Sequence, residues 1–151
     1  MEVKYGKTDS FDDEYYIIQK RYTKTVFSYN TALFLLGETE VTPCITDITI
    51  PREYNVKTLD NTIKTHYISN EYLYLGAIKV ESPYGNEIVT YNLERTICDI
   101  VKNDNSLDKE QINKILRNVF LSNKINGALI IDYAKKLKCE SKIRSIMEVL
   151  I

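Results

Sequence analysis

Apolar positions near the start of the chain recur with the period of an α-helix. One apolar face ends near Arg21 and is formed by four residues at helical spacing, namely Phe11, Tyr15, Ile18 and Tyr22. Ser10 can cap this helix, and acidic residues 12–14 would occupy its first turn, where the helix dipole favours negative charge. After a short extended stretch, Ser28 can cap a second helix, which Gly37 would end.

Patterns typical of β-strands fill the middle of the chain. Residues 45–51 form a β-branched run, and residues 61–69 alternate less cleanly between apolar and polar side chains. Two further runs, 77–81 and 87–91, flank a turn that contains Pro, Asn and Gly85. The last pair of runs therefore predicts a hairpin, in which Gly85 has a structural role.

The last third of the chain returns to helical spacing. Breaks near residues 103–106, 122–124 and 139–141 separate three apolar faces, which are made by Ile112, Ile115, Leu116, Val119 and Phe120, by Leu129, Tyr133 and Leu137, and by Ile143, Ile146, Met147 and Leu150. We therefore predict a flexible N-terminus over residues 1–9 and a single α+β domain over residues 10–151. Its N-terminal helices and C-terminal helical layer would flank a small, mostly antiparallel sheet.

Composition supports one folded domain. The chain has 151 residues, of which 44% are hydrophobic and 27% are charged, values far from those of disordered chains. The three cysteines are widely spaced and follow no secretory leader, so we expect reduced thiols and a cytoplasmic protein. No apolar run approaches the roughly 20 residues of a membrane-spanning helix, so we expect no membrane contact.

A charged motif at residues 91–101, YNLERTICDIV, is the first candidate for chemistry. Asn92 can cap a helix that starts at the next residue, and Glu94 would then lie in its first turn. Arg95 and Asp99 are four residues apart, the spacing of an intrahelical ion pair. Each polar side chain thus has a structural use, and we interpret the motif as scaffolding rather than as a catalytic cluster.

Other catalytic and cofactor motifs have little support. His66 is the only histidine and lies in a predicted strand without a nucleophile motif, and no glycine pattern typical of nucleotide binding occurs. A metal-dependent nuclease would place an acidic-x-Lys pattern on a strand, whereas Lys79 and Glu81 occur in the reverse order and Glu140 and Lys142 lie at a helix boundary. We therefore predict no catalytic residue, no metal and no cofactor.

Basic residues are concentrated in the C-terminal helices. Residues 111–151 contain 8 Lys and Arg against 3 Asp and Glu, whereas residues 1–110 contain 12 against 18. Five of the cations are close in sequence: Lys135, Lys136, Lys138, Lys142 and Arg144. A solvated helix face and a surface that binds a partner or nucleic acid both account for this run.

Several segments, in order and at matching spacing, resemble one family. They are FSYNTALFLLG, ITIPREYN, ESPYGNEIVTYN, NLERTICDI and DYAKKLKCESKIRSIMEVL. Together they resemble the C-terminal domain of the AbiEi antitoxins of bacterial abortive-infection, type IV toxin-antitoxin systems. The likeness runs from about Tyr15 to Ile151, with departures at Tyr29 and Asn30, where the family often has His and Glu, and at Glu38, where an apolar residue is common.

The resemblance implies a non-enzymatic protein that counteracts a nucleotidyltransferase-like toxin, without a stable complex being required. Family members typically carry an N-terminal winged helix-turn-helix that represses the operon as a transcriptional regulator. Only about fourteen residues precede the matching region here, too few for such a module, so the resemblance does not extend promoter recognition to this chain. The alternative is a nucleic-acid-binding accessory domain that acts through the basic C-terminal helices.

Overall fold

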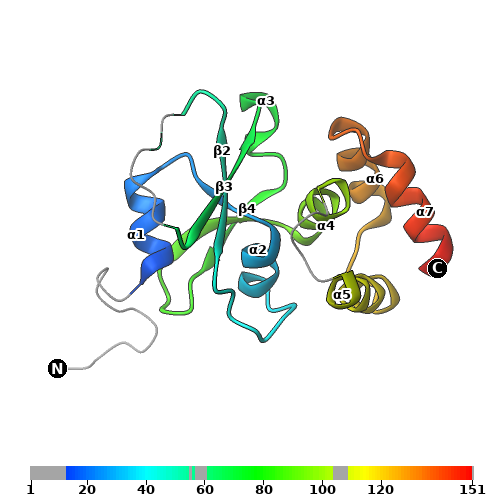
Figure 1. Cartoon of the computed structure of the whole chain (residues 1–151). Helices are drawn as coiled ribbons and strands as arrows, with labels where there is room; N and C mark the ends of the chain where they lie inside the picture. Colours follow the sequence, from blue (N-terminus) through cyan, green and yellow to red (C-terminus); the bar gives the residue numbers. More distant parts are fainter. Residues whose placement is uncertain (1–12, 55, 57–60, 104–108, 151) are drawn as a thin grey trace.

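The protein is an α+β fold, as the sequence predicts. The structure is a computed structural model, and it describes residues 13–54, 56, 61–103 and 109–150. These ranges contain seven helices and a five-stranded sheet. The N-terminal helices flank the sheet, and the C-terminal helices form a layer beyond one of its faces (Figure 1).

The first helix, α1 (Glu14–Arg21), is capped by Asp13 rather than by Ser10. Asp13 Oδ1 accepts a hydrogen bond from the N–H of Tyr16 at 3.2 Å, which satisfies one of the free donors of the first turn. Ser10 and the N-terminal segment 1–9 lie outside the described residues. The helix ends at Arg21, where the sequence predicts.

The second helix, α2 (Tyr29–Leu35), follows the two-residue strand β1 (Val26–Phe27). Ser28 holds the predicted N-cap position, but it makes no capping hydrogen bond and instead accepts one from Thr49 Oγ1 at 2.8 Å. Gly37 has φ +79°, and the N–H groups of Gly37 and the next residue donate to carbonyls of the helix's last turn. Gly37 therefore ends the helix as predicted, in a left-handed cap that suits glycine.

The sheet is mixed, where the sequence predicted a mostly antiparallel one. It consists of β1 with β2 (Thr46–Pro51), β3 (Ile63–Ile68), β4 (Ala77–Glu81) and β5 (Glu87–Tyr91), in the order β3-β2-β1-β5-β4. The β1–β2 and β4–β5 pairs are antiparallel, whereas β2–β3 and β1–β5 are parallel. Parallel pairing joins distant segments, such as Phe27 and Thr90, and leaves no local turn signal in the sequence.

The predicted hairpin is confirmed as β4 and β5. In its turn, Gly85 has φ +85° and its N–H donates to the carbonyl of Ser82, whose own N–H donates to the carbonyl of Asn86. Asp13 accepts hydrogen bonds from the Ser82 hydroxyl and from Asn86 Nδ2. One buried carboxylate thus both caps α1 and anchors it on the hairpin turn.

Each face of the sheet buries an apolar cluster. Phe27, Ile48, Ile50 and Ile88 pack on one face with Ile18 of α1. Val26 and Tyr91 pack on the other face with Leu73 of the short helix α3 (Asn70–Leu73), and α2 lies on this side of the sheet (Figure 1). The chain therefore has a three-layer order of helix, sheet and helices.

Four C-terminal helices form the outer layer: α4 (Leu93–Lys102), α5 (Lys109–Leu121), α6 (Gly127–Lys136) and α7 (Glu140–Leu150). α4 lies between the sheet and helices α6 and α7, and α5 lies beside α2 (Figure 1). The predicted apolar faces meet in one cluster with α4 that includes Ile97, Leu116, Val119, Phe120, Ile130, Tyr133, Leu137 and Ile143. No helix in the described part of the chain is long and apolar enough to cross a membrane.

Candidate functional site

The charged motif lies at the start of α4, and its first two polar residues hold helix ends. Asn92 Oδ1 accepts a hydrogen bond from the N–H of Arg95 at 2.9 Å, and Asn92 Nδ2 donates to the Tyr133 hydroxyl at 3.1 Å. Glu94 Oε2 accepts a hydrogen bond at 2.8 Å from the N–H of Asn126, the N-cap of α6. The predicted cap is confirmed, and both side chains connect α4 to α6.

Arg95 is the most deeply buried charged side chain of the motif. Its Nε lies 3.0 Å from Asp99 Oδ1, and its side chain is 1% exposed. Its Nη1 donates to the carbonyls of Tyr72 and Leu75 at 2.7 and 2.8 Å, at the end of α3. The guanidinium also lies 4.0 Å from the centre of the Tyr91 ring. Arg95 thus joins α4, the α3–β4 turn and β5.

Asp99, the partner of Arg95 in this ion pair, is buried and largely shielded from water. Burial raises the pKa of the Asp99 carboxyl, while the charge and the hydrogen bond of Arg95 oppose that shift. Its Oδ2 has no hydrogen-bond partner among the described residues. Losing Arg95 would leave a buried carboxylate without compensation, so the pair fixes the local fold.

Beside the motif lies a polar cluster that sequence reasoning missed. His66 on β3 and Asp47 on β2 approach to 2.9 Å, and the Tyr29 ring stacks on the His66 ring with centres 4.0 Å apart. Asn103 Nδ2 donates to the Tyr29 hydroxyl at 2.9 Å, and Tyr29 has φ +52°. Burial, followed by the charge of Asp99, raises the pKa of Tyr29. The only sequence signal was a polar residue inside each predicted strand.

This cluster connects strands and helices rather than presenting a nucleophile. The hydroxyls of Ser28 and Thr49 bond to each other, and the N–H of Asp47 donates to Thr31 Oγ1 at 2.8 Å. Among the described residues, no group of three His, Cys, Asp or Glu gathers as metal ligands would. The arrangement can orient β2, β3 and α2, and it gives His66 a carboxylate partner.

One residue from each of the two nuclease-like patterns forms an ion pair at the surface. Lys79 Nζ lies 3.9 Å from Glu87 Oε2 across the hairpin, and both side chains are exposed. Glu140 Oε2 accepts a hydrogen bond from Arg144 Nε at 2.8 Å. The other two residues of these patterns, Glu81 and Lys142, take part in neither ion pair. Glu81 lies opposite Glu87 in the hairpin register.

The five basic residues of the C-terminal helices are all exposed, but they are not equivalent. Lys136 pairs with Asp132 at 3.0 Å and Arg144 pairs with Glu140, each within one helical turn. Lys135, Lys138 and Lys142 have no described carboxylate within 4.0 Å, so they carry most of the local positive charge.

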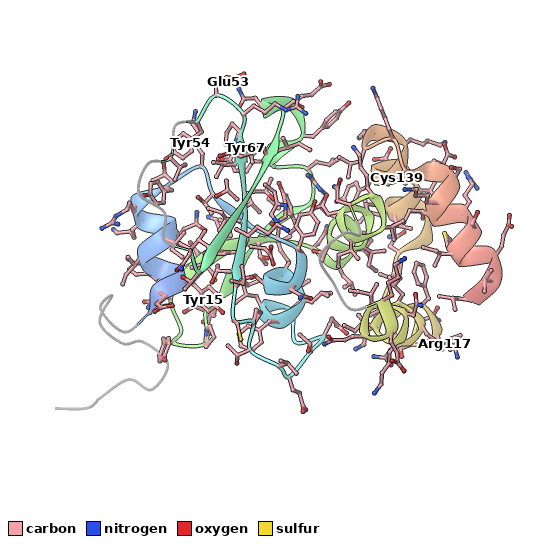
Figure 2. All side chains as sticks on the ribbon, viewed as in Figure 1. Tyr15, Glu53, Tyr54, Tyr67, Arg117 and Cys139 are labelled. Atoms are coloured by element: carbon pink, nitrogen blue, oxygen red, sulfur yellow. The ribbon has the colours of Figure 1, made fainter. Side chains whose placement is uncertain are left out.

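Two cysteines lie in the core of this layer. Cys139 follows α6 (Figure 2), and its Sγ donates to the carbonyl of Cys98, while Cys98 Sγ donates to the carbonyl of Ile130. The neighbouring Cys139 thiol, followed by burial, raises the pKa of the Cys98 thiol. Cys44 is free and exposed. The buried pair therefore packs α4 against the α6–α7 junction.

No protein-family model matches the sequence, and no curated protein matches it.

Proposed function

We propose that the chain is a non-catalytic, antitoxin-type recognition domain that counteracts a nucleotidyltransferase-like toxin. The proposal rests on one structural observation together with the ordered resemblance to AbiEi antitoxins. The charged side chains of the NLERTICDI segment are the first candidates for reactive groups, and they are buried in the protein interior. Counted over the whole residue, Arg95 is 0% exposed and Asp99 is 6% exposed.

The physical argument concerns access. A catalytic arginine or carboxylate must reach a substrate, whereas Arg95 spends its donors on Asp99 and on two backbone carbonyls. The ion pair and the hydrogen bonds of Arg95 offset the cost of burying these charges, and they fix the junction of α3, α4 and β5. Activity of the domain is therefore assigned to its outer surfaces, and the charged motif supports them.

Co-expression tests this proposal. The adjacent open reading frame is first read for a nucleotidyltransferase-like protein. The chain is then produced together with that protein, and growth is compared with that of cells that produce the candidate toxin alone. Rescue of growth is the expected result. Failure of rescue while the folded protein accumulates would overturn the proposal, and co-purification of the two proteins would separate direct contact from indirect opposition.

Nucleic-acid binding by the α6–α7 corner is the second candidate, favoured by the three lysines that have no described carboxylate within 4.0 Å. Binding of this kind weakens steeply with salt, because each neutralised phosphate releases counterions. Replacing Lys135 and Lys138 by Glu would abolish it, whereas replacing Lys79, an exposed lysine on the hairpin, would not. Unchanged duplex binding after the first pair of substitutions would reject this surface.

A further inference from the structure

An open groove runs between α5 and α7. Two adjoining hollows of about 410 and 380 Å³ share the lining residues Asn113, Leu116, Ser145 and Ile146. The first also reaches Ile100 and Val101 of α4, and the second continues to Val149 and Leu150. The groove is therefore continuous along one side of α7.

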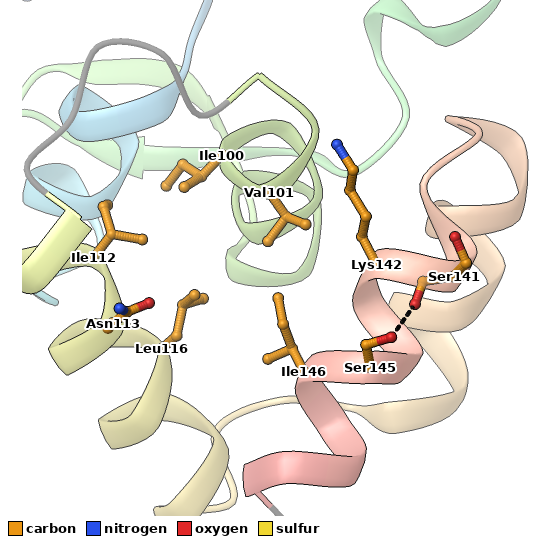
Figure 3. A pocket seen from close by; sticks show the side chains of 9 residues that line it. All are labelled: Ile100, Val101, Ile112, Asn113, Leu116, Ser141, Lys142, Ser145 and Ile146. Atoms are coloured by element: carbon orange, nitrogen blue, oxygen red, sulfur yellow. Dashed lines mark hydrogen bonds between the residues drawn. The ribbon is translucent and has the colours of Figure 1, made fainter.

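Its floor is apolar. Figure 3 shows Ile100, Val101, Ile112, Leu116 and Ile146 projecting toward the same space. The lining residues of α7 are Ser141, Lys142, Ser145, Ile146, Val149 and Leu150, which recur once per helical turn. At a rise of about 1.5 Å per residue, this face is about 13 Å long, or between two and three helical turns.

Val149 is the most exposed part of this apolar surface. It is 82% exposed, more than any other large hydrophobic residue in the described part of the chain. The Ser145 hydroxyl is already satisfied within α7, because it donates a hydrogen bond to the carbonyl of Ser141 at 2.9 Å (Figure 3). A partner that covered the groove would bury this apolar area, and it would place a polar group near the exposed Asn113 side chain, which lines both hollows.

The charges of the groove have one sign. Lys142 lines one end and Arg117 lines the other, and no described acidic residue lines either hollow. Neither cation lies within 4.0 Å of a described carboxylate. Arg117 lies on the outer part of the helical layer, where its side chain is exposed (Figure 2). An occupant with carboxylates at both ends of an apolar stripe would complement this arrangement.

Symmetry disfavours a second copy of the chain as this occupant. In a two-fold dimer the groove of one copy would face the groove of the other. Lys142 and Arg117 of one copy would then face Lys142 and Arg117 of the second, so that like charges would meet. An amphipathic helix of opposite charge has no such conflict, and grooves between helices bind such helices through apolar anchors at i, i+3 or i+4, and i+7.

We infer that the α5–α7 groove binds an acidic amphipathic helix of a partner protein. The apolar stripe of that helix packs on Leu116, Ile146 and Val149, and its flanking carboxylates lie near Lys142 and Arg117. The inference rests on the recognition role proposed above, since it gives that role a surface. Its test is peptide binding in vitro, which can fail independently of growth rescue.

The test uses the full chain and a labelled helical peptide of about 15 residues, held helical by a side-chain staple. The peptide carries leucines at i, i+4 and i+7, with glutamates flanking the stripe, and binding is followed by fluorescence polarisation. We expect saturable binding that weakens with salt. The same peptide with lysines in place of the glutamates should bind at least about 10-fold more weakly.

Matched variants locate the site. Val149→Glu should raise the Kd about 10-fold or more, whereas Leu121→Glu, which changes another exposed aliphatic residue outside the groove, should leave it unchanged. Lys142→Glu should raise the Kd by several-fold to about 10-fold, whereas Lys114→Glu, outside the groove on the same layer, should have little effect. Circular dichroism confirms that each variant is folded.

Five results would overturn the inference. The first three are no binding of the acidic peptide, equal binding by the wild type and Val149→Glu, and equal binding of the lysine-flanked peptide. The fourth is self-association that Val149→Glu abolishes without any affinity for the peptide, which would assign the groove to a second copy. A fatty acid that binds the groove while the peptide does not would likewise reject a helical partner.

Discussion

A Cβ atom at Gly76 would lie 2.8 Å from the Cβ of Arg95. The two residues are therefore in direct contact, with the α3–β4 turn pressed against the first turn of α4. Gly76 also has φ +79°, and its carbonyl accepts a hydrogen bond from the N–H of Asn92 at 2.7 Å. The buried position of the charged motif thus depends on a residue without a side chain.

Gly76→Ala should lower the free energy of unfolding by about 2–4 kcal/mol, because it adds a steric clash to a left-handed backbone. Gly37→Ala is the matched control: Gly37 also has φ +79°, but nothing lies within 4 Å of its added Cβ. This control should lose only about 1 kcal/mol. Urea unfolding measures both variants, and equal losses would contradict the tight contact with α4.

Arg95→Ala should destabilise the fold by about 3–5 kcal/mol, because it leaves the Asp99 carboxylate buried without its partner. Arg144→Ala is the control, since Arg144 forms an ion pair of the same i, i+4 spacing with Glu140 but is 54% exposed. It should lose at most about 0.5 kcal/mol. Similar losses for the two variants, measured by urea unfolding, would argue against a buried scaffold.

Lys138→Gly should raise the free energy of unfolding by about 0.5–1 kcal/mol. Lys138 has φ +63°, and the N–H of Cys139 donates to the carbonyl of Ala134, which makes Lys138 the left-handed cap of α6. Glycine adopts this backbone without the steric penalty of a Cβ, although it also adds freedom to the unfolded chain. Lys138→Ala removes the same charge and keeps the penalty, so a comparable gain with alanine would contradict the prediction.

The protein should lose stability at alkaline pH because Tyr29 and Tyr91 are buried. Burial raises the pKa of both phenols above the ordinary value of 10.0, so the folded chain holds protons that the unfolded chain releases. Stability is therefore intact below about pH 10 and falls as the pH rises further, by up to about 1.4 kcal/mol per pH unit for each tyrosine.

Phenolate absorbance and circular dichroism, recorded together during an alkaline titration, check this prediction. The phenolate signal of the two buried tyrosines should appear only as the helical signal is lost. Tyr29→Phe should show a shallower fall in stability above about pH 10 than the wild type. Full ionisation of all tyrosines in a protein that retains its native circular dichroism would contradict it.

Local signals account for what the sequence predicted. Asn92 caps α4, Gly37 ends α2 and the Pro-Tyr-Gly turn joins β4 to β5, because capping and turn preferences act over a few residues. The spacing of Arg95 and Asp99 likewise predicted their ion pair. The sequence could not show how deeply this pair is buried, since the carbonyls that Arg95 contacts lie in another part of the chain.

Long-range contacts account for the rest. The parallel pairing of β1 with β5 joins residues far apart in sequence, and the two-residue strand β1 is too short to show a pattern. Ser28 was predicted to cap α2 with its side chain, but Thr49 is its partner across β1 and β2. The α5–α7 groove depends on the placement of whole helices, so no single motif predicted it.

Growth rescue per folded molecule is the most direct test of the central claim that the charged motif is scaffold and that the domain acts by recognition. Arg95→Ala and wild type are co-expressed with the toxin at a temperature where the variant remains partly folded, and rescue is divided by the amount of folded protein. Equal rescue per folded molecule is the expected result. An Arg95→Ala protein that is fully folded and fails to rescue would contradict the account.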